Sequence, residues 1–173
     1  MATRPTSDRL RETLFNVLAP RLEGARFLDL YAGSGAVGIE ALSRGAAQVT
    51  FVERAPAALK VLRANLARLG IGQGFHLQPG SVAAYVRRGH AGQAFDVVFL
   101  DPPYGAAEEY AATLGALGGA PAVLLAAGAV VIAEHRRKEK LEDAYGLLKR
   151  TRLLEQGDAA LSFYAAGAEG NER

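Results

Sequence analysis

Residues 101–104 read Asp-Pro-Pro-Tyr and directly follow the apolar run 95–100. The carboxylate of Asp101 and the carbonyl of Pro102 are hydrogen-bond acceptors, and a planar amino group needs such acceptors before its delocalised lone pair becomes nucleophilic. The prolines fix φ and hold the acceptors in place, and Tyr104 can stack on a base, worth about 1–3 kcal/mol. Asp before Pro also suits an ordinary turn. We favour the chemical interpretation, in which Asp101, Pro102, Pro103 and Tyr104 orient an amino group.

A glycine-rich segment, residues 29–35, ends an earlier apolar run. Gly33 and Gly35 lack Cβ, so a ligand can approach the backbone where the next helix presents its free N–H groups. Glu53 ends the following run, where an acid can accept hydrogen bonds from ribose hydroxyls. Gly38 completes a G-x-G-x-x-G spacing, which leaves a nicotinamide dinucleotide open. The Asp-Pro-Pro-Tyr segment favours S-adenosylmethionine instead, because a dehydrogenase has no evident use for it.

The elements that must position these segments alternate between strand and helix patterns. Apolar runs predict strands at residues 27–31, 49–53, 75–78, 95–100 and 129–134, and helical spacing predicts helices at residues 7–18, 35–44, 56–69, 82–88 and 108–117. This rhythm is typical of βαβ units with a parallel sheet. Two further runs, 147–154 and 159–165, flank a turn signal and predict a closing antiparallel hairpin.

Composition narrows the class of protein. The chain has 173 residues, which we read as one domain over residues 1–173, with a lead-in helix within 1–22 and a frayed tail at 168–173. It has no cysteine, which excludes disulfides and thiolate chemistry and fits the cytoplasm. Its 20 basic and 18 acidic side chains argue against a dedicated polyanion binder. We expect no metal site, because the histidines show no ligand spacing, and no membrane segment.

A basic segment follows the fifth predicted strand. It comprises His135, Arg136, Arg137 and Lys138. Because the carboxyl ends of parallel strands meet at one edge of a sheet, this segment should lie near the glycine turn and Asp101. We predict that it neutralises RNA phosphates, although a solvated basic loop is an equally good reading.

Several segments together resemble one family. They are residues 4–6, 11–16, 27–35, 40–46, 51–53, 65 and 95–104. They are similar to the RsmD-type methyltransferases, which modify guanine N2 in bacterial small-subunit ribosomal RNA. The resemblance covers nearly the whole chain. It implies a Rossmann-like α/β fold dependent on S-adenosylmethionine, with a seven-stranded, mostly parallel sheet, the last strand antiparallel, and helices on both faces.

The resemblance also implies roles for individual residues. The set expected to contact S-adenosylmethionine is Arg4, Thr6, Asp29, Tyr31, Gly33, Ser34, Gly35, Glu53, Arg54, Ser81 and Val82. The partner implied is small-subunit rRNA or an assembling 30S particle, and we favour a monomer. The family usually carries a basic hairpin before Arg-Pro-Thr, whereas this sequence starts at Met1, so we expect part of the RNA-contacting surface to be absent. Ser81 stands where many relatives have an acid beside the adenine, so we expect a weaker or backbone-mediated contact there.

Other functions remain open from sequence. Related tetrapeptides serve adenine-N6 methylation of DNA and glutamine-N5 methylation of proteins, although both enzyme classes normally need an additional domain. The chain could also belong to another functional class, as a catalytically silent module that binds cofactor or RNA. The intact Asp101 to Tyr104 segment argues against it. A nicotinamide oxidoreductase is the least favoured alternative.

Overall fold

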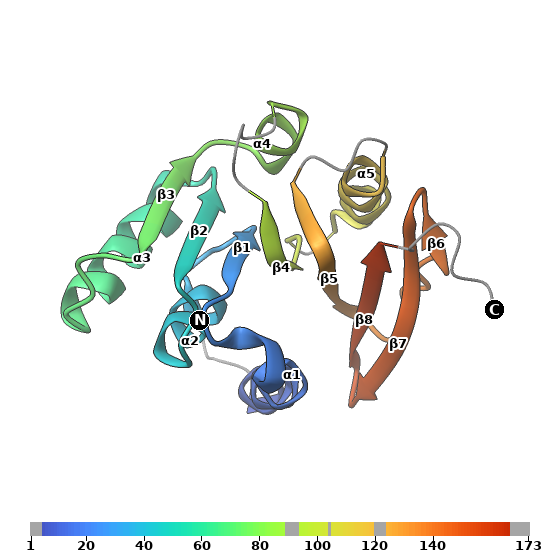
Figure 1. Ribbon diagram of the computed structural model, residues 1–173, viewed down its shortest axis with the longest axis horizontal. Coiled ribbons are helices and arrows are strands. Elements are labelled where there is room, and N and C mark those ends of the chain that lie inside the picture. The colour runs from blue at the N-terminus through green and yellow to red at the C-terminus, as the bar shows by residue number, and fades with distance from the viewer. Residues whose placement is uncertain (1–4, 89–93, 104, 120–123, 167–173) are drawn as a thin grey trace.

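The computed structural model describes residues 5–88, 94–103, 105–119 and 124–166 of the chain. The predicted contributions of Arg4, Tyr104 and the tail at 168–173 lie outside these residues, and so does the side chain of Thr6. Strands and helices alternate along the chain and form one layered α/β unit (Figure 1). No helix in the described ranges is both long enough and apolar enough to cross a membrane.

The order of elements follows the predicted βαβ rhythm. The elements are α1 (Pro5–Leu22), β1 (Arg26–Leu30), α2 (Ala36–Ser43), β2 (Gln48–Glu53), α3 (Pro56–Arg68), β3 (Phe75–Pro79), α4 (Val82–Arg88), β4 (Phe95–Leu100), α5 (Ala107–Leu117), β5 (Leu125–Arg136), β6 (Ala144–Tyr145), β7 (Leu148–Gln156) and β8 (Ala159–Ala166). The lead-in helix α1 extends further in both directions than the apolar spacing indicated. The bounds of α4 and β4 agree with the prediction.

One sheet joins all the described strands in the order β3-β2-β1-β4-β5-β8-β7-β6. The pairs among β1 to β5 are parallel, and β8 is antiparallel to β5. The described part of the chain has eight strands where seven were predicted. The difference arises at the edge, because β6 is only two residues long and pairs with β7 alone. The strand order reverses between β1 and β4, which is where α/β sheets of this kind bind ligands.

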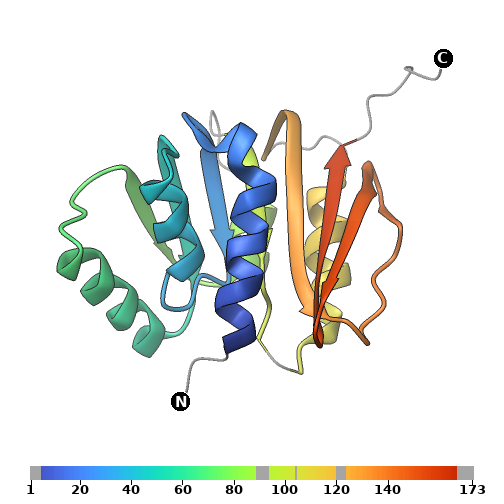
Figure 2. The same cartoon turned by 90° about the horizontal axis from the view of Figure 1, so that it is seen from below.

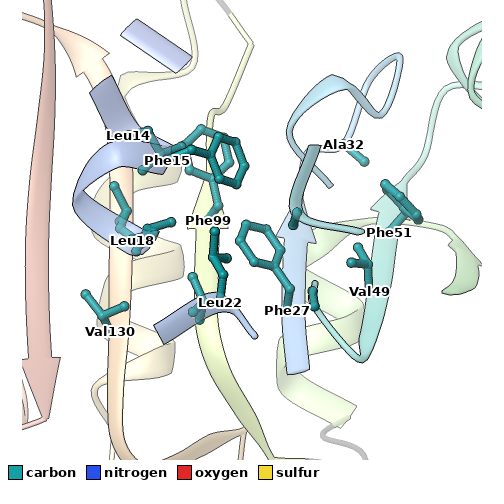
Figure 3. Packing of buried hydrophobic residues seen from close by; sticks show 14 of the residues in the cluster. Leu14, Phe15, Leu18, Leu22, Phe27, Ala32, Val49, Phe51, Phe99 and Val130 are labelled. Carbon is teal, nitrogen blue, oxygen red and sulfur yellow. The ribbon is translucent and has the colours of Figure 1, made fainter. Parts of the chain in front are cut away.

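Helices cover both faces of the sheet. In Figure 2 the helices α1, α2 and α3 lie in front of it and α5 lies behind, and Figure 1 shows α4 on the same side of the sheet as α5. On the first face, Leu14, Phe15 and Leu18 of α1 pack with Phe27 of β1 and Phe99 of β4 (Figure 3). All five side chains are at most 2% exposed. Truncating one such aromatic ring to alanine typically costs about 3–5 kcal/mol, so this contact anchors α1 firmly across the central strands.

The fifth strand is longer than its apolar run. β5 starts at Leu125 rather than near residue 129, and its pairing with β4 shifts register between Phe95 and Val97. Gly128, with φ of 76°, lies at this irregularity. The carboxyl end of β5 also extends to Arg136, because β8 pairs with it as far as Arg136 opposite Ala159. Pairing with β4 at one end and with β8 at the other therefore extends the strand beyond its apolar run.

Candidate functional site

A cleft of about 610 Å³ opens where β1, β2, β4 and β5 end. Eight predicted residues line it: Asp29, Tyr31, Gly33, Ser34, Glu53, Arg54, Asp101 and Pro103. Eight further residues line it as well: Arg11, Ala32, Ala36, Val37, Ala55, Phe99, Glu109 and Glu134. The structure thus brings the glycine turn and the start of the Asp-Pro-Pro-Tyr segment into one cavity, although about 70 residues separate them in the chain.

The two glycines of the turn, Gly33 and Gly35, have different surroundings. Gly33 has φ of 58°, and a Cβ placed on it would meet no protein atom within 4 Å, so its surface faces open space. Gly35 is buried beneath the turn, has φ of 84°, and would drive a Cβ into the side chain of Leu62. Gly33 therefore suits close approach of a ligand, whereas Gly35 permits the turn and the packing of α2 against α3.

Glu53 holds the turn from the neighbouring strand. Its Oε1 accepts a hydrogen bond of 2.8 Å from the backbone N–H of Gly33, and its Oε2 accepts one of 2.8 Å from the N–H of Ala55. Each carboxylate oxygen has a further lone pair. Glu53 can therefore fix the turn and still accept hydrogen bonds from ligand hydroxyls in the cleft.

Asp29 lies at the floor of the cleft and is 2% exposed. Its Oδ2 accepts a hydrogen bond of 3.0 Å from the backbone N–H of Gly38 in α2. Burial raises the pKa of Asp29 well above its ordinary value, the Gly38 hydrogen bond opposes this, and the charge of Glu53 adds to it. A cationic ligand group placed here would offset the desolvation of the carboxylate and lower its pKa again.

Tyr31 links the glycine turn to α5. Its backbone has φ of 60°, in the left-handed region that non-glycine residues seldom adopt. Its hydroxyl donates to Oε2 of Glu109 at 3.1 Å and hydrogen-bonds the hydroxyl of Thr113 at 2.8 Å. Burial, above all, raises the pKa of Tyr31 to about 12, so the phenol stays protonated and can act as a donor. The helix that follows residues 101–104 is thereby tied to the turn.

The Asp-Pro-Pro segment leaves β4 at the centre of the sheet edge. Asp101 is exposed and lines the cleft, Pro102 is buried, and Pro103 lines the cleft again. The carbonyl of Pro103 accepts a hydrogen bond from the N–H of Ala106, closing a turn before α5. The two proline rings fix φ at the buried Pro102 and at the next residue, Pro103. The Asp101 carboxylate is therefore presented to the cleft by a constrained backbone.

Besides Gly35, two predicted cofactor contacts, Ser81 and Val82, do not line the cleft. The Ser81 hydroxyl accepts a hydrogen bond from the N–H of Ala84 at 3.1 Å, as expected of a residue capping α4. Val82 is 5% exposed and belongs to the core beneath α4 and α5. Neither residue is among those that line the cavity. Ser81 therefore has a structural role at the start of this helix.

His135 departs from its predicted role as a phosphate contact. Its side chain is 6% exposed, its Nε2 hydrogen-bonds the Ser162 hydroxyl at 2.8 Å, and its Nδ1 hydrogen-bonds the carbonyl of Arg136. Burial lowers the pKa of His135, which favours the neutral ring. The imidazole is therefore buried and neutral, so we remove His135 from the residues predicted to contact RNA phosphates. Arg136, Arg137 and Lys138 are exposed where β5 ends.

Sequence reasoning missed Arg11, Glu109 and Glu134 as lining residues. Arg11 lies on α1, and the start of this helix is at the same end of the sheet as the arrowhead of β1 (Figure 2). Helical spacing does not reveal which polar side chain faces a cavity, so Arg11 and Glu109 carried no signal. Glu134 did carry a signal, because it is the last residue of the predicted strand 129–134, which neighbours the strand that ends before Asp101.

The residues of the cleft fit an S-adenosylmethionine molecule. The open surface at Gly33 admits a close ligand, the carboxylate of Glu53 suits ribose hydroxyls, and buried Asp29 suits a cationic group. The described residues contain no group of three or more His, Cys, Asp or Glu side chains placed to hold a metal ion.

Comparison with known proteins shows the family to which the chain belongs. Residues 1–165 match the family model described as "Conserved hypothetical protein 95". The protein YlbH of Bacillus subtilis is 34% identical over 164 residues, which cover 94% of this chain and 88% of that protein. The chain belongs to this family. The predicted membership of the RsmD-type methyltransferases, which depend on S-adenosylmethionine, is thereby confirmed.

Further relatives agree with this family. "Ribosomal RNA small subunit methyltransferase D" of Escherichia coli is 45% identical over 101 residues, which span 58% of this chain and 50% of that protein. The solved structure of yhhF from Escherichia coli superposes with a TM-score of 0.82 at 32% identity, covering 98% of this chain and 92% of that one. A Thermus thermophilus protein gives 0.76 at 33% identity, covering 94% and 88%. The RsmD-type chain therefore has the Rossmann-like methyltransferase fold that was predicted.

Proposed function

We propose that this chain transfers a methyl group from S-adenosylmethionine to the exocyclic N2 of a guanine in small-subunit ribosomal RNA. The observation that carries the proposal is that Asp101 and Gly33 line one cleft, at the ends of the neighbouring strands β4 and β1. An amino-group acceptor site beside a nucleotide-cofactor turn is what such a transfer requires. The name of the Escherichia coli relative supports ribosomal RNA as the substrate class.

The chain's own residues would divide the work along the cleft. Glu53 would hold the ribose of the cofactor, with Arg54 beside it, and the turn at Gly33 and Ser34 would hold the methionine end together with Asp29, which would face the ammonium group. When bound, S-adenosylmethionine supplies an electrophilic methyl group on a sulfonium and leaves as the neutral thioether.

The acceptor side rests on the Asp-Pro-Pro-Tyr segment. The Asp101 carboxylate and the Pro102 carbonyl would accept the two N–H groups of guanine N2 and aim its lone pair at the methyl carbon. As the N–C bond forms, N2 must lose one proton, and Asp101 is the base placed to take it or pass it to water. Tyr104 would stack on the base, and Arg4 and Thr6 would lie near the cofactor.

The RNA chain itself would be held outside the cleft. Arg136, Arg137 and Lys138, exposed beyond β5, would neutralise phosphates near the target nucleotide. Five carboxylates line the cleft, namely Asp29, Glu53, Asp101, Glu109 and Glu134. Such a cavity disfavours phosphates and favours an extruded base, so we propose that the target guanine enters unstacked. We propose further that the protein acts as a cytoplasmic monomer, on free rRNA or an assembling 30S particle.

The test is methyl transfer from labelled S-adenosylmethionine to small subunits that lack their methylated guanines, followed by nucleoside mass spectrometry. We expect N2-methylguanosine. Parallel incubations with naked small-subunit rRNA, plasmid DNA and a glutamine-containing release factor separate the alternatives. Label found in N6-methyladenosine or in protein glutamine, with no N2-methylguanosine, would overturn the proposal. Cofactor binding without transfer to any of the four would indicate a silent binding module.

A further inference from the structure

The cleft contains a second carboxylate beside Asp101, at the end of the neighbouring strand. Leu100 of β4 is in register with Ala133 of β5, so the next residues, Asp101 and Glu134, lie at the same level, although Glu134 still pairs with β8. Neighbouring strands lie about 4.8 Å apart. Both residues line the cleft. One base-sized ligand can therefore touch both side chains.

The side chain of Glu134 lies on the face of the sheet that carries α1. Its cross-strand neighbour on β8 is Leu161, a member of the α1-facing core. Phe99, two residues before Asp101, belongs to the same core and also lines the cleft. Side chains two residues apart on a strand share a face. Glu134 therefore faces the side on which Phe99 forms part of the cavity wall.

The backbone at Glu134 is anchored from α5. The Tyr110 hydroxyl donates a hydrogen bond of 2.7 Å to the Glu134 carbonyl. Burial raises the pKa of Tyr110, and the charge of Asp101 is the next contribution, followed by Glu139 and Glu134. The Tyr110 phenol therefore stays protonated, and the charges of both Asp101 and Glu134 contribute to its raised pKa. One helix, α5, holds the end of β5 and follows the segment that carries Asp101.

The other three cleft carboxylates come from different elements. Asp29 of β1 and Glu53 at the end of β2 are on the cofactor side of the strand order, and Glu109 belongs to α5. Asp101 follows β4 and Glu134 belongs to β5, on the opposite side of the strand order. Their position in the sheet therefore suits contact with an acceptor base.

We propose that Glu134 selects the base by accepting the N1–H of guanine while Asp101 holds the adjacent amino group. This rests on the proposed function. Guanine presents N1–H and N2–H as neighbouring donors, which match two neighbouring acceptors. An ionised carboxylate can only accept. A purine with a bare N1 would set a lone pair against Glu134 and leave both groups without a hydrogen bond.

The discriminating probe is 2-aminopurine, which keeps the 2-amino group of guanine but has no hydrogen on N1. RNA carrying guanosine or 2-aminopurine riboside at the mapped target position would be compared by kcat/KM. The wild type should prefer guanosine by about 10–100-fold, the discrimination expected of well-placed hydrogen bonds to a base. In Glu134→Gln the amide N–H₂ can donate to the bare N1. The preference should therefore fall by about tenfold, while the dissociation constant of S-adenosylmethionine stays unchanged.

Matched variants separate recognition from structure. Glu108→Gln alters an exposed carboxylate on the first turn of α5, and it should keep the wild-type preference. Glu134→Ala should lower the preference too, mainly by slowing guanosine. Equal efficiency of the wild type on the two bases overturns the inference even if no variant folds. An unchanged preference in Glu134→Gln, with guanosine still methylated, overturns the inference and leaves the proposed function standing. Absence of any methylated guanosine with the wild type overturns both.

Discussion

The backbone N–H of Gly33 donates a 2.8 Å hydrogen bond to Oε1 of Glu53, which joins the turn after β1 to the end of β2. Oε2 of the same carboxylate accepts the N–H of Ala55 before α3. One side chain therefore sets the spacing between the glycine turn and the start of the next helix. Cofactor affinity should depend on Glu53 through the geometry of the protein as well as through direct contact.

Glu53→Ala should weaken S-adenosylmethionine binding strongly. The change removes two hydrogen bonds to a charged acceptor, each worth about 1.5–3 kcal/mol, and it removes the acceptor proposed for the ribose. We expect the dissociation constant to rise by at least about 100-fold in isothermal titration, because 1.4 kcal/mol corresponds to a factor of about ten. Glu40→Ala is the control, since Glu40 pairs with Arg44 on the surface of α2. An affinity within about threefold of wild type for Glu53→Ala would contradict this role.

The buried carboxylate of Asp29 should make stability depend on pH. Its folded pKa is raised above 3.8, mainly by burial, so between 3.8 and the raised value the folded state binds more protons than the unfolded state. Stability from this group is therefore full below 3.8 and is lost as pH rises through the folded pKa. Asp29→Asn keeps an acceptor for the Gly38 N–H and removes the titration.

The measurement is the difference in Tm between Asp29→Asn and wild type without cofactor, recorded from pH 4 upward in about one-unit steps. The variant should gain on the wild type as pH rises, by at most about 1.4 kcal/mol per pH unit. A saturating cofactor that places a cation at Asp29 should reduce this gain, because it restores a partner for the carboxylate. A difference that shrinks with rising pH would show the opposite sign and refute the assignment.

Close packing under α2 predicts that Gly38→Ala is destabilising. A Cβ at Gly38 would collide with the Phe51 ring and lie 2.9 Å from Cγ1 of Val49. Phe51 and Val49 are 0% exposed, so neither can move into solvent. Overpacking of this kind costs about 1–3 kcal/mol. Gly115→Ala is the matched control, because Gly115 lies in α5 with nothing within 4 Å. It should gain about 0.5–1 kcal/mol in urea unfolding.

Much of the fold followed from local pattern. The apolar run at residues 95–100 forms the buried strand β4, and the helical spacing at 82–88 forms α4. Both patterns predict which side chains are buried, and the packing of the sheet buries them. The two-residue β6 had no such signal, since it exists only through its pairing with β7. The same is true of the carboxyl end of β5, which β8 extends by pairing.

The site was predictable where it ends a strand and unpredictable where it lies on a helix. Asp29 lies near the end of β1, Glu53 ends β2 and Asp101 follows β4. Parallel strands bring these ends to one edge of the sheet. Arg11 faces the cleft from α1 and Glu109 from α5, and only the packing angle of each helix decides that. The misjudged His135 lies near the end of a strand too, but its ring is buried and hydrogen-bonds the Ser162 hydroxyl of β8.

Asp101→Ala should separate catalysis from cofactor binding. Asp101 lines the cleft at the end of β4, whereas the donors and acceptors around the glycine turn come from β1, β2 and α2. Removing the acceptor for N2 should lower the single-turnover rate by about 10²–10⁴-fold, the range expected for loss of proton transfer and orientation. The dissociation constant of S-adenosylmethionine should stay within about threefold of wild type. Glu108→Ala, an exposed carboxylate on α5, should leave both quantities unchanged. Unchanged turnover in Asp101→Ala would remove the residue from the mechanism, and a parallel loss of cofactor affinity would mean that Asp101 supports the cofactor site rather than the acceptor.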